Sequence, residues 1–107
     1  LPLRVDLPAQ NLRHASVKDF GAVGDGMADD TAAIQAAIDY VAAYGGGVVD
    51  IPIGVYPFTS IYIDGEVSLQ GESKRSSVLK QLESATGAAI SVRSPYTSIS
   101  RVRVICN

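Results

Sequence analysis

The feature that most constrains the fold of this chain is a glycine-rich turn that leads directly into an amphipathic helix. Gly21, Gly24 and Gly26 lie within the run from Asp19 to Thr31. Glycine adopts positive φ angles without a steric penalty, so the backbone can reverse direction tightly in this run. We therefore expect a short strand from Val17, a tight turn, and then the start of a helix.

Three residues with side-chain oxygens stand where this helix begins: Asp29, Asp30 and Thr31. Such side chains accept hydrogen bonds from the unpaired N–H groups of a first helical turn, and carboxylates there also face the positive end of the helix dipole. We interpret these residues, together with Asp25, as capping and turn residues. Their spacing lacks the ligand series of a calcium loop, and nothing sets two carboxyl groups across a sugar for hydrolysis.

The predicted helix covers about residues 30–44 and has one apolar face. Residues at the helical spacing i, i+3, i+4, i+7 and i+10 form that face: Ile34, Ala37, Ile38, Val41 and Tyr44. Gln35 and Asp39 lie on a different face. Three consecutive glycines end the helix, and Gly45 suits the left-handed position after its last turn.

Short extended segments follow the helix. We predict strands at Val48–Pro52, Val55–Phe58, Ile61–Ile63, Glu66–Gln70, Val78–Leu82, Ala88–Val92 and Ser98–Cys106. In the last segment Val102, Val104 and Cys106 share one face, and Arg101 and Arg103 point the other way. The last four strands begin ten to twelve residues apart, which suits either an antiparallel sandwich or barrel or a solenoid of parallel strands. Only Asp64-Gly65 is a good hairpin turn, so the turns slightly favour the solenoid.

The order of these motifs resembles the opening of the pectate-lyase-like superfamily. The resemblance is carried by four consecutive segments: Val17–Gly26, Asp29–Ile38, Gly45–Val49 and Pro52–Tyr56. It is close over Val17–Phe58 and looser as far as Asn107. That superfamily includes bacteriophage tailspikes, capsule depolymerases and polygalacturonase-type hydrolases. The resemblance implies a mainly β fold, namely the start of a right-handed, single-stranded parallel β-helix, with an N-terminal amphipathic helix that covers the open first coil.

Three regions follow from this assignment. We expect residues 1–16 to be an extended lead-in or linker, residues 17–58 to form the N-terminal cap, and residues 59–107 to form the first coils. The helix would turn Ile34, Ile38 and Val41 toward the open end of the coil. Because a clean strand ends next to Asn107, we expect further coils beyond it, as in the amino-terminal portion of a longer protein.

Composition excludes several classes of function. A net charge of −2 gives no basic surface for nucleic acid or an acidic membrane. Cys106 is the one cysteine, so an internal disulfide is impossible, and it is interpreted as a small buried hydrophobe. No apolar run reaches the length of a membrane span, and Leu1–Ser16 lacks the pattern of a signal peptide. We predict no cofactor and no metal site.

The remaining polar residues are weighed between a sugar-binding role and an ordinary surface role. Those in the turns are Asp64, Glu66, Glu72, Lys74 and Arg75. With Arg101 and Arg103, the basic ones have the chemistry to neutralise a uronate carboxylate during elimination, but we interpret the whole set as solvated surface.

Aromatic residues and the histidine are weighed in the same way. Tyr56, Tyr62 and Tyr96 can stack on sugar rings, although partial burial against a neighbouring coil is the interpretation preferred for each. His14, the single histidine, is interpreted as an exposed lead-in residue. No residue matches a catalytic motif of the superfamily, so no catalytic residue is assigned.

The expected function comes from the resemblance. The whole protein is expected to resemble a phage tailspike that binds and cleaves bacterial surface polysaccharide, as a homotrimer, in the virion tail or outside cells, without nucleic-acid or membrane partners. Three alternatives stay open: a secreted pectin-degrading lyase or polygalacturonase-type hydrolase, a non-enzymatic adhesin or virion connector, and a free-standing small β-sandwich.

Overall fold

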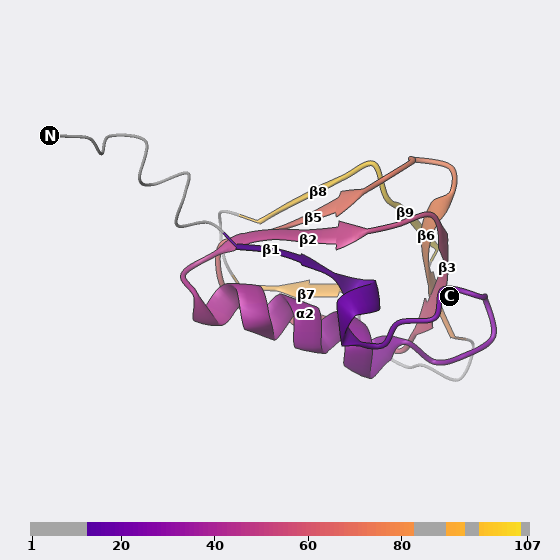
Figure 1. Cartoon of the computed structure of the whole chain (residues 1–107), viewed down its shortest axis with the longest axis horizontal. Helices are drawn as coiled ribbons and strands as arrows, with labels where there is room; N and C mark the ends of the chain where they lie inside the picture. The colour runs from indigo at the N-terminus through magenta and orange to yellow at the C-terminus, as the bar shows by residue number, and fades with distance from the viewer. Residues whose placement is uncertain (1–12, 83–89, 94–96, 106–107) are drawn as a thin grey trace, which may run out of the picture.

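The fold is a stack of short parallel strands, and the α-helix α2 lies at the end of the stack where the chain begins, called here the first end (Figure 1). The structure, a computed structural model, describes residues 13–82, 90–93 and 97–105. Its helical elements are η1 (Val17–Phe20), a 3-10 helix, and α2 (Thr31–Ala43). The strands are β1 (Arg13–Ser16), β2 (Gly47–Ile51), β3 (Gly54–Phe58), β4 (Ile61–Ile63), β5 (Val67–Gly71), β6 (Ser77–Gln81), β7 (Ile90–Val92), β8 (Ser98–Ser100) and β9 (Arg103–Ile105).

Each turn of the chain adds one strand to each of three sheets in the same order. Sheet A has the order β1-β2-β5-β8, sheet B the order β3-β6-β9, and sheet C the pair β4-β7. All six pairings between these described strands are parallel. An antiparallel sandwich or barrel is therefore contradicted, and the predicted fold class, the start of a parallel β-helix with a capping helix, is confirmed.

The core is built from side chains of the same register in successive coils. In sheet A, Ala15, Val49 and Leu69 stand in one column, and all three are buried. In sheet B, Tyr56 pairs with Leu79, and both are fully buried. Because inward residues recur at every second position, each strand contributes a buried row to one continuous interior.

The helix α2 covers the first end of this interior, below β1 in Figure 1. Its inner face consists of Ile34, Ala37, Ile38 and Val41, all with no exposed surface. The helix packs against η1, β1, β2 and β4. Tyr44, which was predicted to share this face, is 51% exposed and instead makes an edge-to-face contact with Tyr40, with the ring centroids 5.1 Å apart. The helix ends before it, so the inner face stops at Val41.

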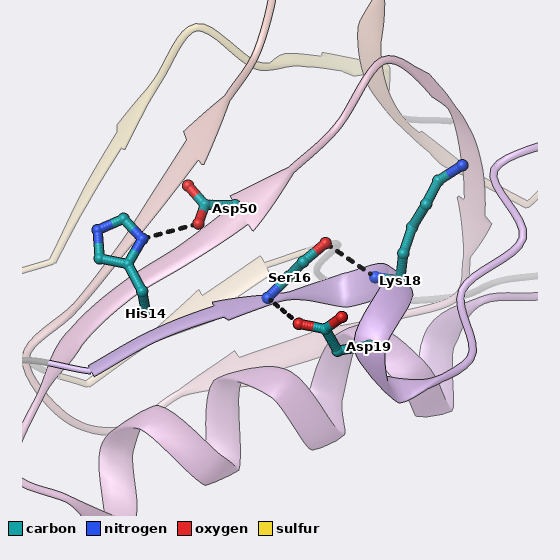
Figure 2. A network of polar contacts seen from close by, with 5 residues as sticks. All are labelled: His14, Ser16, Lys18, Asp19 and Asp50. Atoms are coloured by element: carbon teal, nitrogen blue, oxygen red, sulfur yellow. Dashed lines mark hydrogen bonds and ion pairs between the residues drawn. The ribbon is translucent and has the colours of Figure 1, made fainter.

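One predicted element near the N-terminus is wrong, because Val17–Phe20 is a 3-10 helix and not a strand. Arg13–Ser16, within the region predicted as an extended lead-in, is extended and forms the strand β1 beside β2. The reason is a capping box: the Ser16 hydroxyl accepts a hydrogen bond from the N–H of Lys18 at 3.2 Å, and Asp19 Oδ2 accepts one from the N–H of Ser16 at 3.3 Å (Figure 2). These bonds end β1 and start the 3-10 turn.

The last predicted strand, Ser98–Cys106, is divided into two strands in the structure. β8 lies in sheet A and β9 in sheet B, and the chain turns between them at Arg101, whose φ is 56°. Alternation of apolar and polar residues fits both strands equally well, so the pattern alone hides the corner. Val102 and Val104 are half-buried against the core, as predicted, whereas Cys106 lies outside the described residues. Asp64-Gly65 likewise forms a corner between sheets C and A and not a hairpin.

Within the described part of the chain, no helix is long and apolar enough to span a membrane.

Candidate functional site

The first edge of sheet B is closed by backbone of the glycine-rich turn. The N–H of Gly26 donates to the carbonyl of Val55 at 2.8 Å, and the N–H of Val55 donates to the carbonyl of Gly24 at 3.1 Å. The N–H of Asp30 donates to the carbonyl of Pro57 at 2.7 Å. The turn therefore replaces the strand that would otherwise lie beside β3.

The first edge of sheet C is closed by side chains of the helix. The Gln35 amide donates to the carbonyl of Tyr62 at 2.9 Å and accepts from its N–H at 2.8 Å. The Thr31 hydroxyl accepts from the N–H of Thr59 at 2.8 Å. The turn and the helix thus pair the edges of sheets B and C at this end, and sheet A ends in β1, which packs against α2 and η1. This closure protects strand edges that would otherwise template aggregation.

The three aspartates of the turn are engaged by backbone N–H groups. Asp25 Oδ1 accepts from Met27 at 2.9 Å and from Ala28 at 3.0 Å, and these bonds hold the pKa of Asp25 below its usual value. Asp29 Oδ1 accepts from the N–H of Thr31 at 3.0 Å, as expected of a capping residue.

Asp30 has a different role from the predicted one. Its side chain makes no capping bond to α2. It is 3% exposed and accepts from the N–H groups of Val23 at 3.0 Å and Gly24 at 3.1 Å. The Asp30 side chain therefore holds the turn against the start of the helix. Among the described residues, no cluster of three or more acidic, histidine or cysteine residues is arranged to hold a metal ion.

Tyr56 is packed under the same turn. It is fully buried, and its hydroxyl donates to the carbonyl of Pro52 at 2.9 Å. Burial, followed by the nearby charges of Asp30 and Glu72, raises the pKa of Tyr56 to about 12. Because the ring is enclosed, Tyr56 offers no surface on which a sugar could stack.

The outer face of sheet A carries polar side chains from successive coils. His14 Nδ1 lies 2.8 Å from Asp50 Oδ2, across β1 and β2 (Figure 2). One coil later the hydroxyls of Ser68 and Ser98 are 2.9 Å apart. Asp50 is aligned in register with Gln70 of β5. Gln70 aligns in turn with Ser100 of β8, and Asp50 aligns with Ser16 of β1, so one register position is polar in all four strands. This column of hydrogen-bonding groups suits a ligand rich in hydroxyl groups that runs across the coils.

Two shallow depressions lie where sheet A turns into sheet B. The first, of ≈ 380 Å³, is lined by Asp50, Ile51, Pro52, Gln70, Gly71 and Glu72. The second, of ≈ 440 Å³, is lined by Lys74, Arg75, Val102 and Arg103. The first is acidic and polar, and the second is basic. Both are open to solvent, so each can accept part of a polymer but not enclose a small molecule.

Sequence reasoning identified the basic residues but missed Asp50 and Gln70. The signal was present, since Asp50 interrupts the apolar run Val48–Ile51 at an outward position. His14 is exposed, as expected, but it belongs to β1 and contacts Asp50. Its partner stands 36 residues away in the chain, which local spacing does not reveal.

The other candidate residues are dispersed. Tyr62 is 53% exposed on sheet C, and the guanidinium of Arg93, which follows the paired strand β7, lies 5.8 Å from its ring centroid. Asp64 and Glu66 are exposed at the corner between sheets C and A. Tyr96 and Cys106 lie outside the described residues.

Comparison with known proteins finds mannuronan C5-epimerases both among similar sequences and among similar solved structures. Mannuronan C5-epimerase AlgE1 of Azotobacter vinelandii is 42% identical over 90 residues, covering 76% of this chain and 6% of the relative. Among solved structures, the A-module of Azotobacter vinelandii mannuronan C-5 epimerase AlgE4 has a TM-score of 0.76 at 30% identity, covering 84% of this chain and 28% of that one.

A viral protein shares the fold as well. ORF18 of Geobacillus virus E2 has a TM-score of 0.73 at 26% identity, covering 92% of this chain and 22% of the viral chain. This chain thus spans a small part of the length of each of these proteins. The model of the family described as rhamnogalacturonase A/epimerase, pectate lyase-like, matches residues 14–105. The chain therefore belongs to the rhamnogalacturonase A/epimerase, pectate lyase-like family, which confirms the pectate-lyase-like resemblance of its turn, helix and glycine motifs.

Proposed function

We propose that this chain is the N-terminal cap and the first coils of a parallel β-helix protein that acts on polysaccharide. The observation that carries the proposal is the capping of one end of the stack: the Gly24–Asp30 turn pairs the edge of sheet B, and α2 pairs the edge of sheet C and packs against β1 of sheet A. In the described residues the last strands, β8 and β9, each pair with one neighbour alone, so coils can be added there. The polar outer face of sheet A and the names of the relatives support a sugar polymer as the ligand.

In its finer form the proposal is a phage tailspike that binds and cleaves bacterial surface polysaccharide, as a homotrimer in the virion tail or outside cells. The likeness to a viral protein supports it. The run of polar groups across β1, β2, β5 and β8 supports binding of an extended polymer, because each coil presents a further group about 4.8 Å along the stack.

The second candidate is a C5-epimerase, and the likeness to two mannuronan C5-epimerases favours it. Epimerisation and elimination on a uronate ring share a first step, removal of the proton on C5 by a general base. Return of a proton to the opposite face inverts C5 and keeps the polymer intact. Loss of the leaving group on C4 breaks the polymer and leaves a double bond. A secreted pectin-degrading enzyme would also break its polymer.

One experiment separates these activities. The full-length protein is incubated with bacterial capsule, polymannuronate or polygalacturonate, with heat-denatured protein as the control. Chain length is followed by size-exclusion chromatography, and C5 configuration by proton NMR. Shortened chains support the depolymerase, and inverted C5 at constant length supports the epimerase. Binding without either change would indicate an adhesin. If the protein neither binds nor converts any of these polymers, the proposal is overturned.

A further inference from the structure

We infer that the basic depression formed by Lys74, Arg75 and Arg103 binds the anionic groups of a polysaccharide. The inference rests on the proposed function and narrows it, because it selects a charged polymer over a neutral one and names the residues that hold the charge.

The depression is built from two consecutive coils. Lys74 and Arg75 lie in the turn between β5 and β6, and Arg103 begins β9 in the coil above. Arg103 is aligned in register with Val78 of β6, which places it beside the end of that turn. Val102, half-buried, completes the lining. The cations are thus brought together by the stacking of coils and not by their place in the sequence.

The three cations are not neutralised within the described part of the chain. The one ion pair there joins His14 and Asp50, so no carboxylate of the described residues lies within 4 Å of Lys74, Arg75 or Arg103. All three residues are exposed. Three positive charges gathered at one place in a chain of net charge −2 repel one another, and an anion placed among them lowers that repulsion.

The surroundings favour a carboxylate-bearing sugar polymer as the anion. The neighbouring polar depression ends at Glu72, two residues before Lys74, so one polymer can cross both. There its hydroxyl groups would meet Asp50 and Gln70, and a ring carboxylate further along would meet the cations. Guanidinium groups suit this role because they donate two parallel hydrogen bonds to a carboxylate. Glu72 itself accepts from the N–H of Ile53 at 3.2 Å.

The test measures the affinity of the full-length protein for a short oligogalacturonate and for a neutral maltooligosaccharide of equal length, by calorimetry at low salt. Short ligands are used because multivalent attachment would mask the loss of one contact. The variants are Arg103→Gln, the triple variant Lys74→Gln/Arg75→Gln/Arg103→Gln, and Arg103→Lys, which keeps the charge. Lys18→Gln, which removes an exposed cation of the cap, is the matched control.

We expect the charged ligand to bind more tightly, with about threefold weaker binding in Arg103→Gln and on the order of tenfold in the triple variant, as for exposed ion pairs. Arg103→Lys should recover most of the loss, Lys18→Gln should change nothing, and added salt should weaken the preference. Equal affinity for both ligands, or a triple variant that binds like the wild type, would overturn the inference. If the affinities show no preference for the charged ligand but the full-length protein still converts a neutral polysaccharide, the inference about this site fails and the proposed function stands.

Discussion

At the scale of single residues, the close packing of the glycine-rich turn on the buried ring of Tyr56 explains two glycines of the family motifs, Gly24 and Gly54. A Cβ added to Gly24 would lie 2.9 Å from Cε2 of Tyr56, and one added to Gly54 would lie 2.9 Å from the carbonyl oxygen of Gly24. Gly24, Gly54 and Tyr56 therefore pack so closely that neither glycine has room for a side chain. The separation of these residues in sequence reflects the return of the chain after α2.

The first prediction concerns Gly24. Its φ is +73°, and Gly24→Ala would combine a left-handed alanine with a collision against Tyr56. Gly21→Ala is the matched control, because its φ is +101° and nothing lies within 4 Å of the added Cβ. Backbone strain alone costs about 1–3 kcal/mol. Urea denaturation should show a larger loss of unfolding free energy for Gly24→Ala than for Gly21→Ala. Equal losses would contradict the packing described here.

A second prediction concerns Tyr56. Its hydroxyl bond to Pro52 should contribute about 1 kcal/mol at neutral pH, which Tyr56→Phe would remove. The pKa is about 12 in the folded chain against a usual value of 10.0, so the unfolded chain loses its proton first as pH rises. Stability from this group is thus complete below pH 10 and lost between pH 10 and 12.

Denaturation curves of wild type and Tyr56→Phe at pH 7, 10 and 12 check this directly. The wild type should be the more stable at pH 7, and the difference should shrink or reverse at pH 12. A difference that stays constant with pH would mean that the phenol is ionised equally easily in both states.

At the scale of elements, α2 has two separate tasks on two faces. Its inner face buries Ile34, Ile38 and Val41 over the first coil. A neighbouring face carries Gln35, whose amide pairs with the N–H and carbonyl of Tyr62 as an adjacent strand would. A helix therefore covers the interior and also completes the edge of a sheet.

A third prediction isolates the second task. Gln35→Ala should lower the unfolding free energy by about 1–2 kcal/mol, because two hydrogen bonds to β4 are exchanged for water. Asp39→Asn is the control, since Asp39 contacts the Gln35 amide but not β4, and its replacement keeps the accepting oxygen. Thermal unfolding followed by circular dichroism measures both. Equal melting temperatures for Gln35→Ala and wild type would show that the side-chain pairing adds no stability.

At the scale of the whole molecule, stability is graded along the stack. β2 and β5 have a neighbour on each side, and most of their residues are buried or half-buried. β8 pairs with β5 alone among the described strands, and its three residues are exposed. In a stack where each coil contacts its neighbours, local opening is easiest at a strand that has one neighbour and exposed side chains.

The fourth prediction follows from this gradient. In hydrogen–deuterium exchange of this chain, peptides of β5 should exchange slowest and those of β8 fastest. β1 is the internal control: among the described strands it too has a single neighbour, but it packs against α2 and η1, so it should exchange more slowly than β8. Equal protection of β8 and β5 would show that the stack opens as a single unit.

Much of this organisation was readable from local sequence. The helix was expected at about 30–44 and runs from Thr31 to Ala43, because periodicity, alanine content and terminal glycines all act within one element. Val67 and Leu69 are buried in β5, as alternation within the predicted strand Glu66–Gln70 implies. The family followed from the order of these local motifs.

The remaining features depend on which segments stack upon one another. Asp30 was expected to cap α2, but it binds the backbone of Val23 and Gly24, and Arg103 joins Lys74 and Arg75 only through the coil above them. The sequence by itself determined where helix and strands form and which side of each is apolar, since those preferences arise from neighbouring residues. Only the tertiary structure decided the corners, the closed sheet edges and the grouping of charges, because these require the register between coils, which no local pattern encodes.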